Sequence, residues 1–82
     1  MLGGQKVLIN LKEKSNNKLV VKDYLDIDFD MAVEEIKKER FVININKKYT
    51  YAVEYNTIEE AEDAMIVIMK NRNHLEYEYK DY

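Results

Sequence analysis

Apolar residues recur at helical spacing across residues 57–72, and the rest of the predicted fold is arranged around this segment. At about 100° per residue they form one stripe, which is typical of a helix side that packs on a core. The stripe consists of Ile58, Ala61, Met65, Ile68 and Met69. Thr57 and Glu60 stand at the spacing of a capping box. We therefore predict a long helix over residues 57–72.

Two apolar residues of this helix, Ile66 and Val67, fall outside the stripe. Ile66 lies on its flank, and Val67 points nearly opposite, between Glu60 and Asp63. Either the N-terminal segment or a short helix over residues 31–39 covers these side chains, or another molecule does. Because a chain of 82 residues has little material for a second apolar side, we favour a contact with another molecule.

Residues 6–12 and 18–29 alternate between apolar and polar, which is the period of a strand. The apolar side chains occupy odd positions, namely Val7, Ile9, Leu11, Leu19, Val21, Leu25, Ile27 and Phe29. The turn residues 15–17 join the two segments, so we predict a hairpin. Asp23 is the polar exception on the apolar side, and we expect a bulge or a bend there.

Residues 31–39 show a shorter helical pattern. Ala32, Val33 and Ile36 would share one side, and Asp30 is a suitable N-cap. We predict a second helix of about three turns, which would depend on tertiary packing.

A second hairpin is predicted for residues 41–55, with apolar residues again at odd positions. A two-residue loop would pair odd with even positions and turn the tyrosines and isoleucines to opposite faces. A three-residue loop at 46–48 keeps them on one face. It pairs Ile45 with Tyr49, Ile43 with Tyr51 and Phe41 with Val53. We favour this loop, with Lys48 in a left-handed conformation.

The whole chain, residues 1–82, is predicted to form one α+β domain. Residues 1–5 would be frayed, and the alternating residues 74–82 would form an edge strand or a tail that orders against a partner. The expected order is ββαββα with a possible final β, in two layers with an antiparallel sheet of four to five strands. The alternative is a ferredoxin-like βαββαβ order over residues 18–80 with an extra N-terminal strand, which would compete for an occupied edge.

Charge and composition narrow the function classes. Lys and Arg number 13 and Asp and Glu 16, a net charge of −3, which disfavours a dedicated nucleic-acid binder. Without cysteine the small domain cannot be stabilised by a disulfide or a cysteine metal site, so we expect a homo-oligomer, a dimer above all.

No apolar run predicts a membrane span or a signal peptide, so we expect a cytoplasmic protein. The many Lys, Asn, Ile and Tyr residues indicate an AT-rich coding sequence, as in a low-GC bacterium or its phage.

Candidate chemistry is sparse. Asp26, Asp28 and Asp30 alternate as ligands of a hard cation could, but Met31 and Lys37 stand where an EF-hand loop needs Gly and Glu. A solvated strand face is the favoured interpretation. Ser15 and His74 are the only serine and histidine, and no feature of the sequence brings them together. We therefore expect no metal, no cofactor and no enzymatic activity.

The favoured function is a small, self-associating, non-enzymatic protein-interaction module that also binds another protein. A phage or mobile-element regulator or inhibitor of a host protein would be one example. The expected contacts are Ile66, Val67, Tyr77 and Tyr79. The alternative is a single-stranded nucleic-acid-binding domain that uses the Lys47/Lys48 hairpin and the tyrosines. The pattern of odd positions in the second hairpin weakens this alternative, because it places Tyr49, Tyr51 and Tyr55 on the core side.

Overall fold

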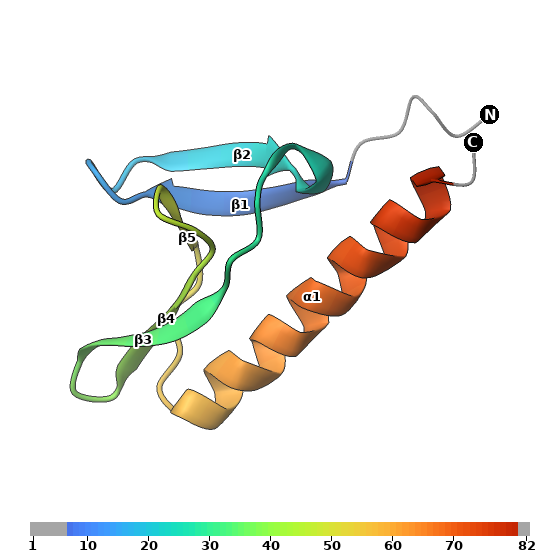
Figure 1. Ribbon diagram of the computed structural model, residues 1–82. Coiled ribbons are helices and arrows are strands. Elements are labelled where there is room, and N and C mark those ends of the chain that lie inside the picture. The colour runs from blue at the N-terminus through green and yellow to red at the C-terminus, as the bar shows by residue number, and fades with distance from the viewer. Residues whose placement is uncertain (1–6, 81–82) are drawn as a thin grey trace.

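The computed structural model describes residues 7–80 of the chain, with side chains to residue 75. A five-stranded antiparallel sheet lies beside one long helix (Figure 1). The elements are β1 (Leu8–Glu13), β2 (Leu19–Asp23), the 3-10 helix η1 (Tyr24–Asp26), β3 (Ala32–Lys37), β4 (Arg40–Asn44), β5 (Tyr49–Tyr51) and α1 (Ile58–Lys80). The strand order across the sheet is β2-β1-β5-β4-β3. The α+β class is confirmed, whereas the ββαββα order and the ferredoxin-like alternative are wrong, because each needs a second helix.

Residues 31–39 form a strand and a turn instead of the predicted short helix. Strand β3 pairs with β4, with Val33 opposite Ile43, and Glu39 takes a left-handed φ of 60° in the connecting turn. Val33 packs against the core from this position. A helix of three turns is marginal on its own. The backbone ladder to β4 therefore outweighs a weak helical spacing.

The predicted first hairpin is present, but the predicted face of its second strand is wrong. Leu11 of β1 lies opposite Val20 of β2, so even-numbered β2 residues share the core face. Leu19 and Val21 point instead to the face of the sheet away from α1, called here the outward face, and are 66% and 55% exposed. The connecting turn, in which Asn17 takes a φ of 59°, pairs odd with even positions and shifts the phase of β2 by one residue.

The expected bend at Asp23 is confirmed, since β2 ends there. The Asp23 side chain accepts a hydrogen bond of 2.9 Å from the Leu25 N–H and so begins η1. From here residues 24–31, the crossover segment, carry the chain from one sheet edge to the other (Figure 1). Tyr24 stacks on Phe29 with ring centroids 5.6 Å apart. Burial raises the pKa of Tyr24, and a hydrogen bond with Asn71 of α1 acts in the opposite direction.

The loop between β4 and β5 has the predicted length. The Ile45 N–H donates to the Tyr49 carbonyl at 3.0 Å, which confirms their pairing around residues 46–48. Lys48 does not take the predicted left-handed conformation. Within residues 7–80, the residues with a positive φ are Asn17 and Glu39. The Asn46 side chain instead accepts hydrogen bonds from the Lys48 and Tyr49 N–H groups.

Further from this loop the predicted register fails. Phe41 pairs with Tyr55 through two backbone hydrogen bonds of 2.8 Å, and not with Val53. Val53 is consequently 44% exposed. The irregular residues 52–54 take up this shift of two positions.

Helix α1 extends to Lys80, so the predicted strand over residues 74–80 is wrong. The Thr57 half of the predicted capping box is confirmed, because Thr57 Oγ1 accepts from the Glu60 N–H at 3.2 Å. The Glu60 carboxylate accepts from the Thr57 hydroxyl at 3.1 Å, where a capping box would use the Thr57 backbone N–H. Leu75 packs against the core seven residues after Ile68 and so continues the helical stripe. The buried core comprises Ile9, Leu11, Tyr24, Ile27, Ile43, Ile45, Ala61 and Ile68. Ile58 and Met69, expected in the stripe, are 43% and 37% exposed at its margin.

Candidate functional site

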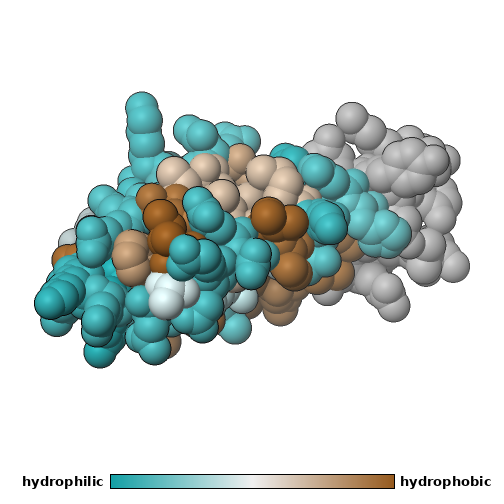
Figure 2. Space-filling view, turned by 90° about the horizontal axis from the view of Figure 1, so that it is seen from below, coloured by the Kyte–Doolittle hydropathy of each residue, from teal (hydrophilic) through white to brown (hydrophobic). Residues whose placement is uncertain are grey.

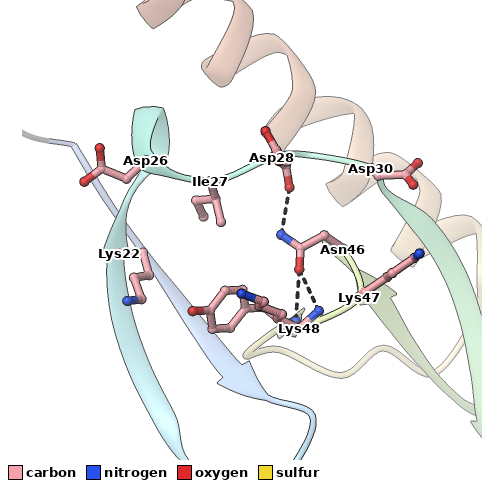
Figure 3. A pocket seen from close by; sticks show the side chains of 9 residues that line it. Lys22, Asp26, Ile27, Asp28, Asp30, Asn46, Lys47 and Lys48 are labelled. Carbon is pink, nitrogen blue, oxygen red and sulfur yellow. Dashed lines mark hydrogen bonds between the residues drawn. The ribbon is translucent and has the colours of Figure 1, made fainter.

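A groove of about 520 Å³ lies between the crossover segment and the loop that joins β4 to β5 (Figure 3). Its lining comes from three parts of the chain that are distant in sequence. These are Lys22 of β2, then Asp26, Ile27, Asp28 and Asp30 of the crossover segment, and Asn46, Lys47, Lys48 and Tyr49 at the loop.

Asn46 holds the two walls of the groove together. Its Nδ2 donates to the Asp28 carbonyl at 2.8 Å, while its Oδ1 accepts from the Lys48 and Tyr49 N–H groups at 2.8 and 3.2 Å (Figure 3). The Asp30 N–H adds a hydrogen bond of 2.8 Å to the Ile45 carbonyl. One side chain therefore sets both the loop conformation and its distance from the crossover segment.

The groove carries charges of both signs. No ion pair joins these lysines to these aspartates, whereas Arg40 pairs with Glu54 at 2.6 Å elsewhere in the structure. Lys22 Nζ lies 5.9 Å from the centroid of the Tyr49 ring, within range of a cation–π interaction. The ammonium groups of Lys47 and Lys48 stand on an exposed loop and are accessible to an anionic ligand.

The three aspartates that alternate in sequence do not converge. Figure 3 shows Asp26 and Asp30 at opposite ends of the crossover segment, with their carboxylates directed apart. In the part of the chain that the structure describes, no three acidic, histidine or cysteine side chains gather as metal ligands do. The cation site considered from the sequence is therefore not formed by these residues. Their separation follows from η1, which breaks the extended strand assumed for residues 18–29.

Ser15 and His74 also lie apart. Ser15 belongs to the turn between β1 and β2, and His74 to the last turns of α1; Figure 1 shows these at opposite ends of the molecule. The fold therefore assembles no serine–histidine pair from them.

Of the predicted interface residues, Ile66 and Val67 are exposed on α1, at 50% and 56%. At 100° per residue, Ile66 shares one flank of the helix with Ile58 and Met69, whereas Val67 lies alone on the other. We call Ile58, Ile66 and Met69 the helix flank. Tyr77 and Tyr79 belong to α1, and their side chains lie outside the described residues.

Sequence reasoning missed a second exposed apolar surface on the outward face of the first hairpin. Leu8, Leu19 and Val21, called here the hairpin patch, are 57%, 66% and 55% exposed. Leu8 lies opposite Asp23, which makes it a diagonal neighbour of Val21. The signal in the sequence was the uninterrupted run Leu19-Val20-Val21, which puts apolar side chains on both faces of one strand.

Seen from below relative to the view of Figure 1, the surface shows brown apolar patches separated by teal polar side chains (Figure 2). Within residues 7–80 no helix is both long and apolar enough to cross a bilayer. No known protein family, curated protein or solved structure matches this chain.

Proposed function

We propose that this chain is a small, non-enzymatic protein-interaction module that self-associates and binds a second, different protein. The observation that carries the proposal is the number of large apolar side chains left in contact with water. Eleven are exposed within residues 7–75: Val7, Leu8, Leu19, Val21, Leu25, Ile36, Val53, Ile58, Ile66, Val67 and Met69.

Single exposed apolar residues are normal on a protein surface, but contiguous groups mark interaction sites. Six of the eleven fall into two groups of three, the hairpin patch and the helix flank. In the helix flank, Ile66 and Met69 are neighbours one turn apart, and Ile58 lies about two turns before Ile66. Complete burial of such a side chain contributes about 1.5–3 kcal/mol, and these are already about half buried. Each group therefore offers about 2–4 kcal/mol to a partner that covers it.

The two groups lie on opposite layers of the fold, one on the outward face of the sheet and one on the helix. Two different partners can thus be bound at the same time. The mild net charge of −3 favours neither a polyanion nor a strongly basic partner. A regulator or inhibitor of a host protein, encoded by a phage or mobile element, fits this size and composition.

The proposal is tested by sedimentation of the wild-type protein over micromolar concentrations, followed by affinity capture from the source cell or its host. We expect a dimer, and a captured protein whose recovery falls when Ile66→Glu is the bait. Val67→Glu adds the same charge to the exposed apolar position on the other flank, and its recovery shows whether that side of α1 also contributes to the contact. A monomer throughout, together with equal capture by all three baits, would contradict the proposal.

A second function, binding of single-stranded nucleic acid, is supported by the basic side of the groove. Lys22, Lys47 and Lys48 surround Tyr49 there, and an aromatic ring among cations suits a stacked base and its phosphate. The aspartates on the other wall oppose it, because they repel the phosphate backbone. Protein binding is therefore the better supported function.

Fluorescence anisotropy with single-stranded oligonucleotides at low salt tests this second function. Binding through the groove would be lost in Lys47→Gln/Lys48→Gln. It would persist in Lys37→Gln/Lys38→Gln, which removes two adjacent charges at the end of β3 and the start of the turn to β4. No binding by the wild-type protein would eliminate the idea.

A further inference from the structure

Strand β2 forms one edge of the sheet, and no described element lies beyond it (Figure 1). Its pairing with β1 is regular over all five residues. Hydrogen bonds at its two ends establish which backbone groups it already uses. The Glu13 N–H donates to the Lys18 carbonyl at 2.9 Å, and the Tyr24 N–H donates to the Val7 carbonyl at 3.0 Å.

These two bonds define the direction of every backbone group in β2. Hydrogen-bonded and non-hydrogen-bonded pairs alternate along an antiparallel ladder. Since residues 18 and 24 bond to β1, residues 20 and 22 do as well. Leu19, Val21 and Asp23 therefore direct their N–H and C=O groups away from the sheet, toward the position of a further strand.

We propose that this position is filled by β2 of a second copy, antiparallel, with Val21 opposite Val21 of that copy. The proposal rests on the self-association in the proposed function and names its surface. Leu19 and Val21 would each lose exposed apolar area, and the hairpin patches of both copies would become continuous on the outward face. The product is a single sheet formed from two five-stranded sheets.

Charge selects the antiparallel direction. The strand begins after Lys18 and ends at Asp23. An antiparallel pair brings the basic end of each copy beside the acidic end of the other, whereas a parallel pair would set Lys18 near Lys18 and Asp23 near Asp23.

Charge also selects the register. With Val21 on the two-fold axis, Leu19 lies opposite Asp23, and Val20 lies opposite Lys22, so no like charges face each other. A shift that sets Val20 on the axis places Lys18 opposite Lys22. A shift the other way sets Lys22 opposite Lys22. Like charges directly opposite are destabilising, so the register centred on Val21 is favoured. It also uses all three outward-directed residues of β2.

The absence of cysteine from the chain allows a clean cross-linking test. Directly opposite residues of a hydrogen-bonded pair have Cα atoms about 5.5 Å apart, within the range of about 4.4–6.8 Å that a disulfide spans. We expect Val21→Cys to give a disulfide-linked dimer under mild oxidation. Leu19→Cys should not, because its two copies would lie about 13 Å apart along the strands. Ile36→Cys, on the other sheet edge and 46% exposed, is the control for random collision.

A sedimentation experiment on the same positions tests the surface without cross-linking. Val21→Lys puts like charges on the axis and removes the apolar contact there, and we expect the dimer dissociation constant to rise by about fivefold or more. Ile36→Lys should leave it unchanged. Circular dichroism of each variant verifies that the exposed substitution preserves the fold.

The outcomes separate the two levels of the proposal. A wild-type monomer would overturn both the self-association and the β2 pairing. A wild-type dimer that survives Val21→Lys, or that cross-links through Ile36→Cys and not Val21→Cys, would overturn the β2 pairing alone. Cross-linking through Leu19→Cys instead of Val21→Cys would overturn the register.

Discussion

The two edge strands of the sheet, β2 and β3, differ in how well they are protected against pairing with a further strand. An edge strand exposes unpaired backbone groups that can recruit another strand, and natural proteins protect such edges with charges and bulges. β3 has both devices: Glu34, Glu35 and Lys37 lie within it, and its register with β4 shifts between Glu35 and Lys37. β2 pairs regularly with β1 and exposes Leu19 and Val21.

The charges that β2 does carry are engaged elsewhere. Asp23 accepts the Leu25 N–H, and Lys22 lies over the Tyr49 ring on the core face of the sheet. Neither side chain therefore protects the outward-directed N–H and C=O groups of Leu19 and Val21 from pairing with another strand. The comparison shows that the protection of an edge depends on where its charges are directed and not only on their number.

The largest expected effects concern the buried strands beside each edge. Leu11 of β1 and Ile43 of β4 are both fully buried. We expect Leu11→Ala and Ile43→Ala each to lower the free energy of unfolding by about 2–5 kcal/mol, as a cavity in a packed core does. Urea denaturation measures both. A loss below about 1 kcal/mol for either would mean that its half of the sheet is not packed as described.

A proline scan of β2 should give the next largest effect. Val20→Pro removes an N–H that bonds to β1, and we expect a loss of about 1–3 kcal/mol from the unpaired carbonyl that remains. Val21→Pro removes an outward-directed N–H and should cost less, since proline is tolerated at such edge positions. Urea denaturation at low protein concentration compares the two. Equal losses would contradict the assigned hydrogen-bond direction.

Removal of the charges from the other edge should make β3 behave like β2. We expect Glu35→Val with Lys37→Val to change stability by less than about 1 kcal/mol, because both residues are exposed. Association at micromolar concentrations should nevertheless increase in light scattering. Lys70→Val, an exposed position on α1, is the control for a general rise in surface hydrophobicity.

The smallest expected effect is a loss of folding stability at alkaline pH, to which a tyrosine beside each half of the sheet contributes. Burial is the main cause that raises the pKa of Tyr24, next to β2, and of Tyr55, next to β4. A raised pKa means that the folded state holds the phenol proton more tightly than the unfolded state. The associated stability is complete below about pH 10 and is lost as the pH rises through the folded pKa. Urea midpoints measured across this range should fall less in Tyr24→Phe and in Tyr55→Phe than in the wild type.

Periodicity predicted the elements whose local pattern agrees with their tertiary surroundings. The Thr57 cap, the buried Ala61 and Ile68, and the loop at 46–48 were all readable from spacing and parity. Residues 31–39 were not, because Val33 and Ile36 fit a helix locally, whereas the hairpin ladder to β4 turns at residues 38–39, where no Gly or Asn marks a turn in the sequence.

The candidate site was readable only in part. Lys47 and Lys48 could be placed at a hairpin tip. Their grouping with Lys22 depends on the crossover segment, and Asn46 meets Asp28 across 18 positions of sequence. The hairpin patch was missed because the turn over residues 14–17, in which Asn17 has a left-handed backbone, pairs odd with even positions and so reverses the faces of β2.

The central position of β5 has a consequence for how the sheet is assembled. Strands β3, β4 and β5 follow one another as a meander, and β1 and β2 form a separate hairpin. The seam between these two units is the pairing of β1 with β5, three residue pairs that include Leu11 with Tyr51, forty positions apart. Closing so long a chain loop is slow relative to forming either local unit. We expect the seam to form last in folding and to open first under load, with the hairpin and the meander separating as intact pieces.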